Sequence, residues 1–104
     1  MPSSKDYLAY VLDGLSLCDN ISSRAMMGEY ILYFRGKVIG GIYDDRFLVK
    51  ITDSSRKMLA NAPLELPYEG AKKMLLIEDA DDREFLRDLF LAMEPELPVI
   101  KKKR

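Results

Sequence analysis

Few side chains in this sequence could carry out catalytic chemistry. The chain contains no histidine and a single cysteine, Cys18. Nucleophilic catalysis by a Ser-His or Cys-His pair therefore lacks its base, and a lone thiol forms neither an internal disulfide nor a conventional zinc site. Because Cys18 follows an apolar stretch, we interpret it as a small packed side chain and not as a nucleophile.

Two groups of carboxylates could hold a cation or serve as a general acid and base. Asp44 and Asp45 are adjacent between two β-prone segments, where acidic residues more often form a turn. Residues 79–82 resemble part of a calcium loop, but the glycine and glutamate that such a loop requires are missing, so helix capping explains them better. The glycines of residues 36–41 match neither a P-loop nor a dinucleotide-binding pattern. We therefore expect a non-enzymatic protein with no catalytic residue, no metal and no cofactor.

Tyrosines and a basic C-terminus are the features that could contact nucleic acid. Tyr30, Tyr33 and Tyr43 could stack on bases, but the residues between them are not enriched in Lys or Arg. The last four residues are all cationic, namely Lys101, Lys102, Lys103 and Arg104. Such a tail either makes weak, salt-sensitive contacts with phosphates or is a solvated, disordered end.

The composition is that of one globular domain. The chain has 104 residues, of which 48% are hydrophobic and 32% charged, and its net charge is -1. Four of the 16 cations lie in the tail, so residues 1–100 carry 12 cations against 17 acidic residues, a net charge of -5. No apolar run could span a bilayer and no secretory signal is visible, so we expect a cytoplasmic protein without membrane contact. We predict a single domain at residues 1–98 and a basic tail at residues 99–104.

Hydrophobic periodicity predicts three helices and about five strands. The helices are expected at residues 4–18 with Ser3 or Ser4 as N-cap, at residues 53–60 with Asp53-Ser54-Ser55 as the cap, and from the opening segment Asp79-Ala80-Asp81-Asp82 as far as Pro95. The strands are expected at residues 22–27, 29–34, 38–43, 46–51 and 74–77, with an irregular connection at residues 64–72. Gly40 and Gly41 inside a strand indicate a bulge or the close approach of a helix backbone.

This order of elements, α-ββββ-α-β-α, predicts an α+β fold with an antiparallel meander packed against N-terminal, middle and C-terminal helices. Both faces of the meander are apolar. Tyr30, Leu32 and Phe34 share one face of their strand, while Ile31 and Tyr33 point to the other. One layer of helices covers only one face, so the second must meet another helix or another molecule. A homodimer through the second apolar face is one expectation.

The order and spacing of several short motifs resemble the N-terminal domain of the TfoX/Sxy family. The motifs are Arg24-Ala25-Met26-Met27-Gly28-Glu29, the strand at residues 30–34, Gly36-Lys37, residues 44–50 and Pro67-Tyr68. Together they cover roughly residues 5–94. Met27 stands where the family pattern, an Arg-x-Met-Phe-Gly turn, usually has phenylalanine, and this change keeps the position apolar.

The resemblance implies an α+β fold and a regulatory or interaction role. Family members in competence-forming bacteria regulate DNA-uptake genes beside a cyclic-AMP-responsive transcription activator, and the family supplies no catalytic residues. Full-length regulators carry a second, helical domain, so we expect a stand-alone copy without it. The expected function is a non-enzymatic regulatory or protein-interaction module, with the transcription machinery as one candidate partner. The alternative is a weak, non-specific nucleic-acid binder that uses the basic tail.

Six residues are candidates for an interaction or structural role in this module. They are Arg24, Gly28, Tyr33, Lys37, Tyr43 and Lys50. Arg24 could donate a charge-assisted hydrogen bond to Glu29 or Asp44 and so lock the sheet, or it could present a cation to a partner. Gly28 is expected to permit a turn or bulge between strands.

Overall fold

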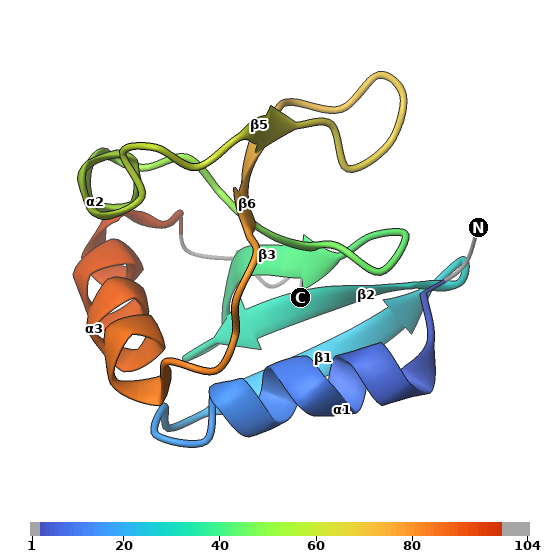
Figure 1. The fold of residues 1–104 in the computed structure, drawn as a ribbon, viewed down its shortest axis with the longest axis horizontal. Helices are drawn as coiled ribbons and strands as arrows, with labels where there is room; N and C mark the ends of the chain where they lie inside the picture. Colours follow the sequence, from blue (N-terminus) through green and yellow to red (C-terminus); the bar gives the residue numbers. More distant parts are fainter. Residues whose placement is uncertain (1–2, 99–104) are drawn as a thin grey trace, which may run out of the picture.

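A computed structural model describes residues 3–98 of the chain (Figure 1). Its elements are α1 (Lys5–Gly14), β1 (Ile21–Met26), β2 (Glu29–Phe34), β3 (Lys37–Ile42), β4 (Phe47–Val49), α2 (Asp53–Met58), β5 (Leu64–Glu65), β6 (Met74–Ile77), α3 (Arg83–Met93) and a 3-10 turn (Glu94–Glu96). The predicted α+β class and element order are confirmed. Within residues 3–98, no helix combines the length and the apolar character needed to cross a membrane.

All six strands form one antiparallel sheet in the order β1-β2-β3-β4-β6-β5. The first four are neighbours in sequence and form the predicted meander, and β6 then pairs with β4. The two-residue strand β5 lies where we predicted an irregular connection. Two residues are too few to show the alternation that identifies a strand, so only its pairing with β6 reveals it.

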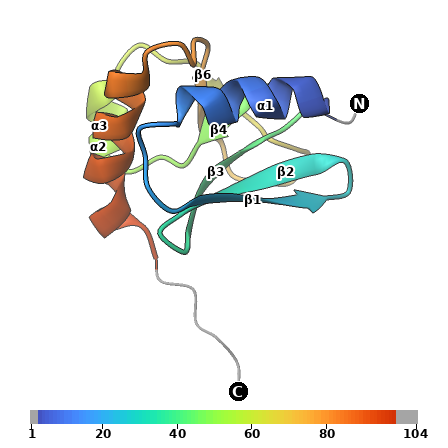
Figure 2. The same cartoon turned by 90° about the horizontal axis from the view of Figure 1, so that it is seen from below.

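Helices α1 and α3 cover one face of the sheet (Figure 2). The core between these helices and the sheet contains Val11 and Leu15 of α1, inward residues of β2, β3, β4 and β6, and four residues of α3. Phe90 of α3 lies at its centre, with its ring 5.6 Å from that of Phe34 and 6.4 Å from that of Phe47. The apolar stripe of α3 therefore faces the sheet, as the periodicity predicted.

Side-chain caps set where each helix begins. The Ser4 hydroxyl accepts a hydrogen bond from the Tyr7 backbone N–H, which confirms one of the two predicted caps. For α2 the cap is Thr52, which forms a reciprocal capping box with Ser55 one residue before the predicted start. For α3 it is Asp82. Helix α1 ends at Gly14, earlier than the predicted residue 18.

Three two-residue turns join the first four strands. Each turn places both central residues at positive φ, as type I′ hairpin turns require. The pairs are Met27-Gly28, Arg35-Gly36 and Asp44-Asp45. Gly28, at φ 85°, therefore makes a turn, which is one of the two roles expected for it. The paired aspartates have the turn-forming role that the sequence favoured.

The two glycines of β3 lie beside a bulge, but a strand and not a helix approaches them. The β2–β3 register shifts between Leu32 and Tyr33, which leaves Ile39 as the extra residue. A Cβ on Gly40 would lie 2.2 Å from the Leu48 carbonyl oxygen of β4. Of the two expected explanations the bulge is confirmed, and the backbone close to Gly40 belongs to β4, the hydrogen-bonded neighbour of β3, and not to a helix.

Ser3 ties the start of α1 to two of these turns. Its backbone N–H donates to the Gly28 carbonyl at 2.9 Å, and its hydroxyl donates to Glu29 at 2.7 Å. The same hydroxyl accepts from the Asp45 backbone N–H at 3.0 Å. Glu29 also accepts from the Asp44 backbone N–H. This network holds α1 against the turn end of the sheet.

Candidate functional site

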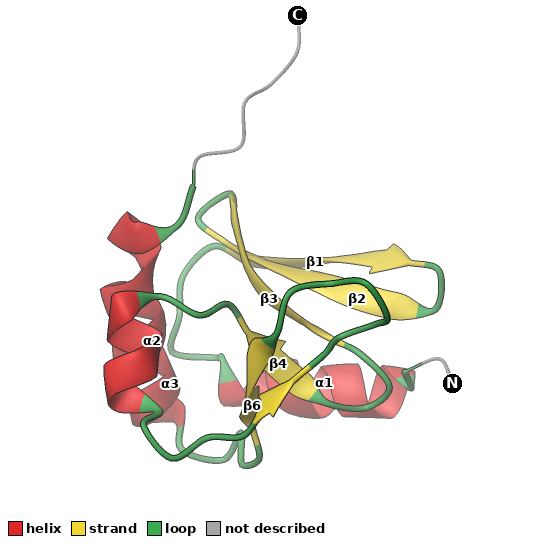
Figure 3. Ribbon diagram, turned by 90° about the horizontal axis from the view of Figure 1, so that it is seen from above, coloured by secondary structure: helices red, strands yellow, loops and turns green. Residues whose placement is uncertain are grey.

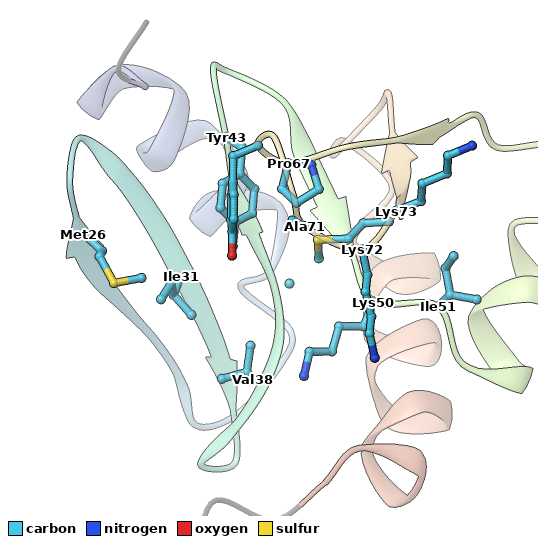
Figure 4. Close-up of a pocket in the computed structure, with 13 residues that line it drawn as sticks. Met26, Ile31, Val38, Tyr43, Lys50, Ile51, Pro67, Ala71, Lys72 and Lys73 are labelled. Carbon is cyan, nitrogen blue, oxygen red and sulfur yellow. The ribbon is translucent and has the colours of Figure 1, made fainter.

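The second face of the sheet carries an open groove of about 650 Å³ between the meander and residues 66–73 (Figure 4). Figure 3 shows the strands and the loops of this part of the chain as a ribbon. We call it the groove. It is lined by Met26, Ile31, Val38, Gly40, Tyr43, Lys50, Ile51, Pro67, Tyr68, Ala71, Lys72, Lys73 and Met74. In Figure 4 the sheet residues lie along one side and Pro67, Ala71 and Lys72 along the other. Its volume is in the range of ordinary ligand-binding clefts.

Strand register explains the apolar floor. Directly opposed residues of antiparallel strands project from the same face, and Ile31 of β2 opposes Gly41 of β3. Tyr43 lies two residues after Gly41, just beyond the end of β3, and projects from that same face. Met26 lies two residues from Arg24, which opposes Ile31. The floor is therefore the face opposite α1 and α3, where the sequence has apolar residues and the fold supplies no helix.

The connection between β5 and β6, residues 66–73, forms the other wall. Arg46 holds its start in place through three contacts: Nη1 pairs with Glu65 at 2.7 Å, Nη2 donates to the Pro67 carbonyl at 3.4 Å, and Nε donates to the Tyr43 carbonyl at 3.0 Å. The Tyr43 and Tyr68 rings lie 6.1 Å apart. This wall is consequently held at its start by Arg46, by the adjacent β5–β6 pairing and by the contact between the two tyrosine rings.

Cations without ion-pair partners surround the groove. Lys50, Lys72 and Lys73 line it, and Arg24 projects from the same face. None of these four forms a salt bridge within residues 3–98, and none of the lining residues is acidic. In Figure 4 the amino groups of Lys50 and Lys72 point toward the same side, while Lys73 extends away. The groove thus combines an apolar floor with a positively charged rim.

Tyr43 adds a polar group to this apolar surface. Burial raises the pKa of its phenol, and the neighbouring Tyr68 and Glu29 raise it further. The phenol is therefore protonated at neutral pH and can donate a hydrogen bond from the groove.

The structure brings together four of the six candidate residues. Tyr43 and Lys50 line the groove, and Arg24 and Tyr33 lie on the same face by register. The expected bond from Arg24 to Glu29 or Asp44 is wrong: Arg24 is exposed and forms no hydrogen bond or ion pair within residues 3–98. The Glu29 carboxylate is occupied by Ser3 and by the Asp44 backbone instead.

The other two candidates lie elsewhere and have structural roles. Gly28 is in the β1–β2 turn. Lys37 pairs with Glu94 at 2.6 Å between Nζ and Oε2, and also donates to the Glu94 carbonyl at 3.0 Å. That contact ties the β2–β3 hairpin to the end of α3 and leaves Lys37 largely buried. The nucleic-acid candidates Lys101, Lys102, Lys103 and Arg104 lie outside the described residues.

Sequence reasoning missed the loop residues of the groove, above all Tyr68, Lys72 and Lys73. Met26 and Tyr68 are 49% and 63% exposed, large values for such hydrophobic side chains. The only indication in the sequence was the adjacent pair Lys72 and Lys73, in a connection, residues 66–73, that has little other charge. Nothing in the sequence, however, indicated that this connection folds back beside Lys50.

Two further kinds of site are metal-ligating clusters and the thiol of Cys18. Within residues 3–98, no cluster of three or more His, Cys, Asp or Glu side chains could hold a metal ion. Burial raises the pKa of the half-buried Cys18 thiol to about 11, and the neighbouring Asp19 adds to the rise. A thiol with so high a pKa is a poor nucleophile, because the reactive species is the thiolate.

Cys18 is expected to alkylate slowly in the folded protein. A pKa of about 11 against the ordinary value of 9.0 lowers the thiolate fraction at pH 8 by about a hundredfold. The reaction with iodoacetamide, followed by mass spectrometry, should therefore be about a hundredfold slower in buffer than in denaturant. It should accelerate as the pH rises toward 11. Equal rates in the folded and unfolded protein would contradict this account of the thiol.

The fold and the groove define the class of the molecule: a small α+β domain with helices on one face of its sheet and an open face opposite. Comparison with known families then identifies the family to which this small α+β domain belongs. Residues 13–90 match the model of the TfoX N-terminal domain. The chain belongs to this family, which confirms the resemblance seen in its motifs.

A comparison with curated proteins finds a relative of similar length. It is described as an uncharacterized 12.7 kDa protein in the trpE 5′ region of Spirochaeta aurantia. The two are 31% identical over 105 residues, which cover all of this chain and 91% of the relative. No solved structure matches the chain.

Proposed function

We propose that this chain is a non-enzymatic regulatory module that acts by binding another protein in the groove. The observation that supports the proposal most directly is the open sheet face. Within residues 3–98 its apolar floor is left open, and the cations at its rim form no salt bridge. Exposed apolar surface of this kind is typical of interaction sites. The same proposal includes a role for this chain in regulating competence genes, as the family resemblance implies. It also includes a cytoplasmic location.

The test compares two variants that each place a charge on an exposed apolar side chain. Met26→Asp changes the groove, whereas Leu91→Asp changes α3 at a similar exposure, 43% against 49%. Full-length wild-type and variant proteins are immobilised and incubated with extract of the organism that encodes them. We expect at least one protein to be retained by wild type and Leu91→Asp and to fall roughly tenfold with Met26→Asp, because a buried charge removes an apolar anchor.

Two results would count against the proposal. One is that no retained protein depends on Met26 although circular dichroism shows all three proteins folded. The other is that Leu91→Asp reduces retention as much as Met26→Asp does, because the effect would then reflect added charge and not the groove.

The predicted homodimer and tail function remain separate predictions. Two-fold pairing through the groove would place two surfaces of the same charge against each other, which is unfavourable. A dimer would appear in light scattering as twice the chain mass of 11.9 kDa. Nucleic-acid binding through the tail would disappear on removal of residues 101–104 and would fall steeply with salt.

A further inference from the structure

The charge at the groove is opposite to the charge of the molecule around it. Residues 1–100 have a net charge of -5, yet the groove is lined by three lysines and no acid. Seven of the twelve cations in residues 3–98 form no salt bridge, and four of these seven lie on the groove face. Those four are Arg24, Lys50, Lys72 and Lys73. A negatively charged partner would therefore be attracted mainly to this face of the molecule.

The floor of the groove limits what that partner can be. Met26, Ile31, Val38 and Met74 offer aliphatic and thioether surface with no fixed hydrogen-bond pattern. Methionine is flexible and polarizable, so it adapts to apolar side chains of different shapes. Apolar side chains of a protein segment fit such a floor, and their carboxylate neighbours would lie at the rim.

A single-stranded nucleic acid fits this surface less well. Stacking needs an aromatic ring with a free face. The Tyr43 ring packs directly on its own strand: a Cβ on Gly41 would lie 2.5 Å from Tyr43 Cε2. The Tyr68 ring also contacts Tyr43, with the centroids 6.1 Å apart and the planes tilted by 53°. Tyr43 is therefore partly covered by its own strand and by Tyr68 and makes a poor platform for a base.

From these observations we infer that the groove binds a segment of another protein in which acidic residues accompany apolar ones. The apolar side chains contact Met26, Ile31 and Val38, and the carboxylates pair with Lys50 and Lys72. The neutral Tyr43 phenol donates to the segment. This inference rests on the proposed protein-binding function and adds the chemistry of the partner.

A selection with short random peptides tests the inference, because it requires no identified partner. A peptide display library is selected on the full-length protein, and enriched peptides are synthesised and measured by fluorescence anisotropy. We expect enrichment of peptides that combine Asp or Glu with aliphatic or aromatic residues. Their affinity should fall with added salt, because exposed charges are screened.

Charge-reversal variants assign this binding to the rim. Lys50→Glu with Lys72→Glu should weaken the selected peptides by roughly tenfold or more. Arg56→Glu with Lys57→Glu is the matched control, because it makes the same change of net charge on α2 and should leave affinity within about twofold. If the half-buried Lys50 is needed for folding, Lys72→Glu with Lys73→Glu reverses two exposed loop residues instead.

Several outcomes would overturn the inference. These are the absence of any enrichment, enrichment of neutral or basic peptides, equal binding by the rim variant, and tighter binding of a single-stranded oligonucleotide that competes with the peptides. A different result is a cellular protein that no longer binds Met26→Asp and still binds the variant with Lys50→Glu and Lys72→Glu. That result would support the proposed function and refute the inference that the partner is acidic. If neither experiment depends on the groove, both proposals fail.

Discussion

Replacement of Phe90 by alanine is expected to lower the free energy of unfolding by about 3–5 kcal/mol. Phe90 is fully buried, and its ring contacts those of Phe34 and Phe47 where α3 meets the sheet. Truncation removes the apolar surface of the ring and leaves a cavity that the surrounding strands cannot close. Since domains of this size unfold at a cost of about 5–15 kcal/mol, Phe90→Ala is expected to remove a large part of the stability.

Urea unfolding followed by circular dichroism measures this loss. Phe90→Leu should cost much less, about 1–1.5 kcal/mol, because leucine keeps much of the volume. Leu91→Ala, at a neighbouring and partly exposed position, should cost under about 1 kcal/mol. A loss for Phe90→Ala no larger than that of Leu91→Ala would show that the aromatic cluster does not hold α3 on the sheet.

Replacement of Gly14 by alanine is expected to destabilise the protein although alanine is the better helix former. Helix propensity alone predicts a gain of up to about 1 kcal/mol. The added Cβ, however, would lie 2.1 Å from the Ala80 carbonyl oxygen, far inside van der Waals contact. Relief requires α1 to move away from the segment before α3, which also disturbs the hydrogen bond from Ala80 N–H to the Tyr10 hydroxyl. We expect a net loss of about 1–3 kcal/mol.

A double variant separates backbone crowding from side-chain crowding at this contact. The Ala80 Cβ lies 3.2 Å from the built Cβ and its carbonyl oxygen 2.1 Å, so the backbone makes the closer contact. Gly14→Ala with Ala80→Gly should therefore remain destabilised in thermal unfolding. A Gly14→Ala variant as stable as wild type would mean that α1 shifts without cost, contrary to the tight packing seen here.

The elements that sequence reasoning located well are those with a clear repeat. The strand at residues 29–34 and the apolar stripe of α3 were recognisable because alternation and helical spacing persist over several residues. Turn chemistry at Gly28 and at the two aspartates was also recognisable, since few residue types adopt positive φ. Local pattern was sufficient for these features.

The features that escaped prediction depend on contacts between distant residues. The pairing of Glu29 with Ser3 spans 26 positions, so no local pattern indicated that Glu29 would be unavailable to Arg24. Lys72 joins Lys50 only because β6 pairs with β4 and the preceding connection folds back over the sheet. The two-residue strand β5 exists only through its partner β6. Tertiary structure, and not propensity, therefore determines half of the candidate site.

The groove has one wall that contributes little to the hydrophobic core. Pro67 is the one buried residue of the segment 66–73, and none of these residues belongs to the hydrophobic core cluster, whereas the opposite wall is the sheet itself. Substitutions, insertions or deletions in this connection should therefore be tolerated thermodynamically while they reshape the cleft and its charge. Related domains could in this way acquire different binding preferences on an unchanged scaffold. For protein engineering, the same separation makes residues 66–73 the natural segment to randomise when a new specificity is sought.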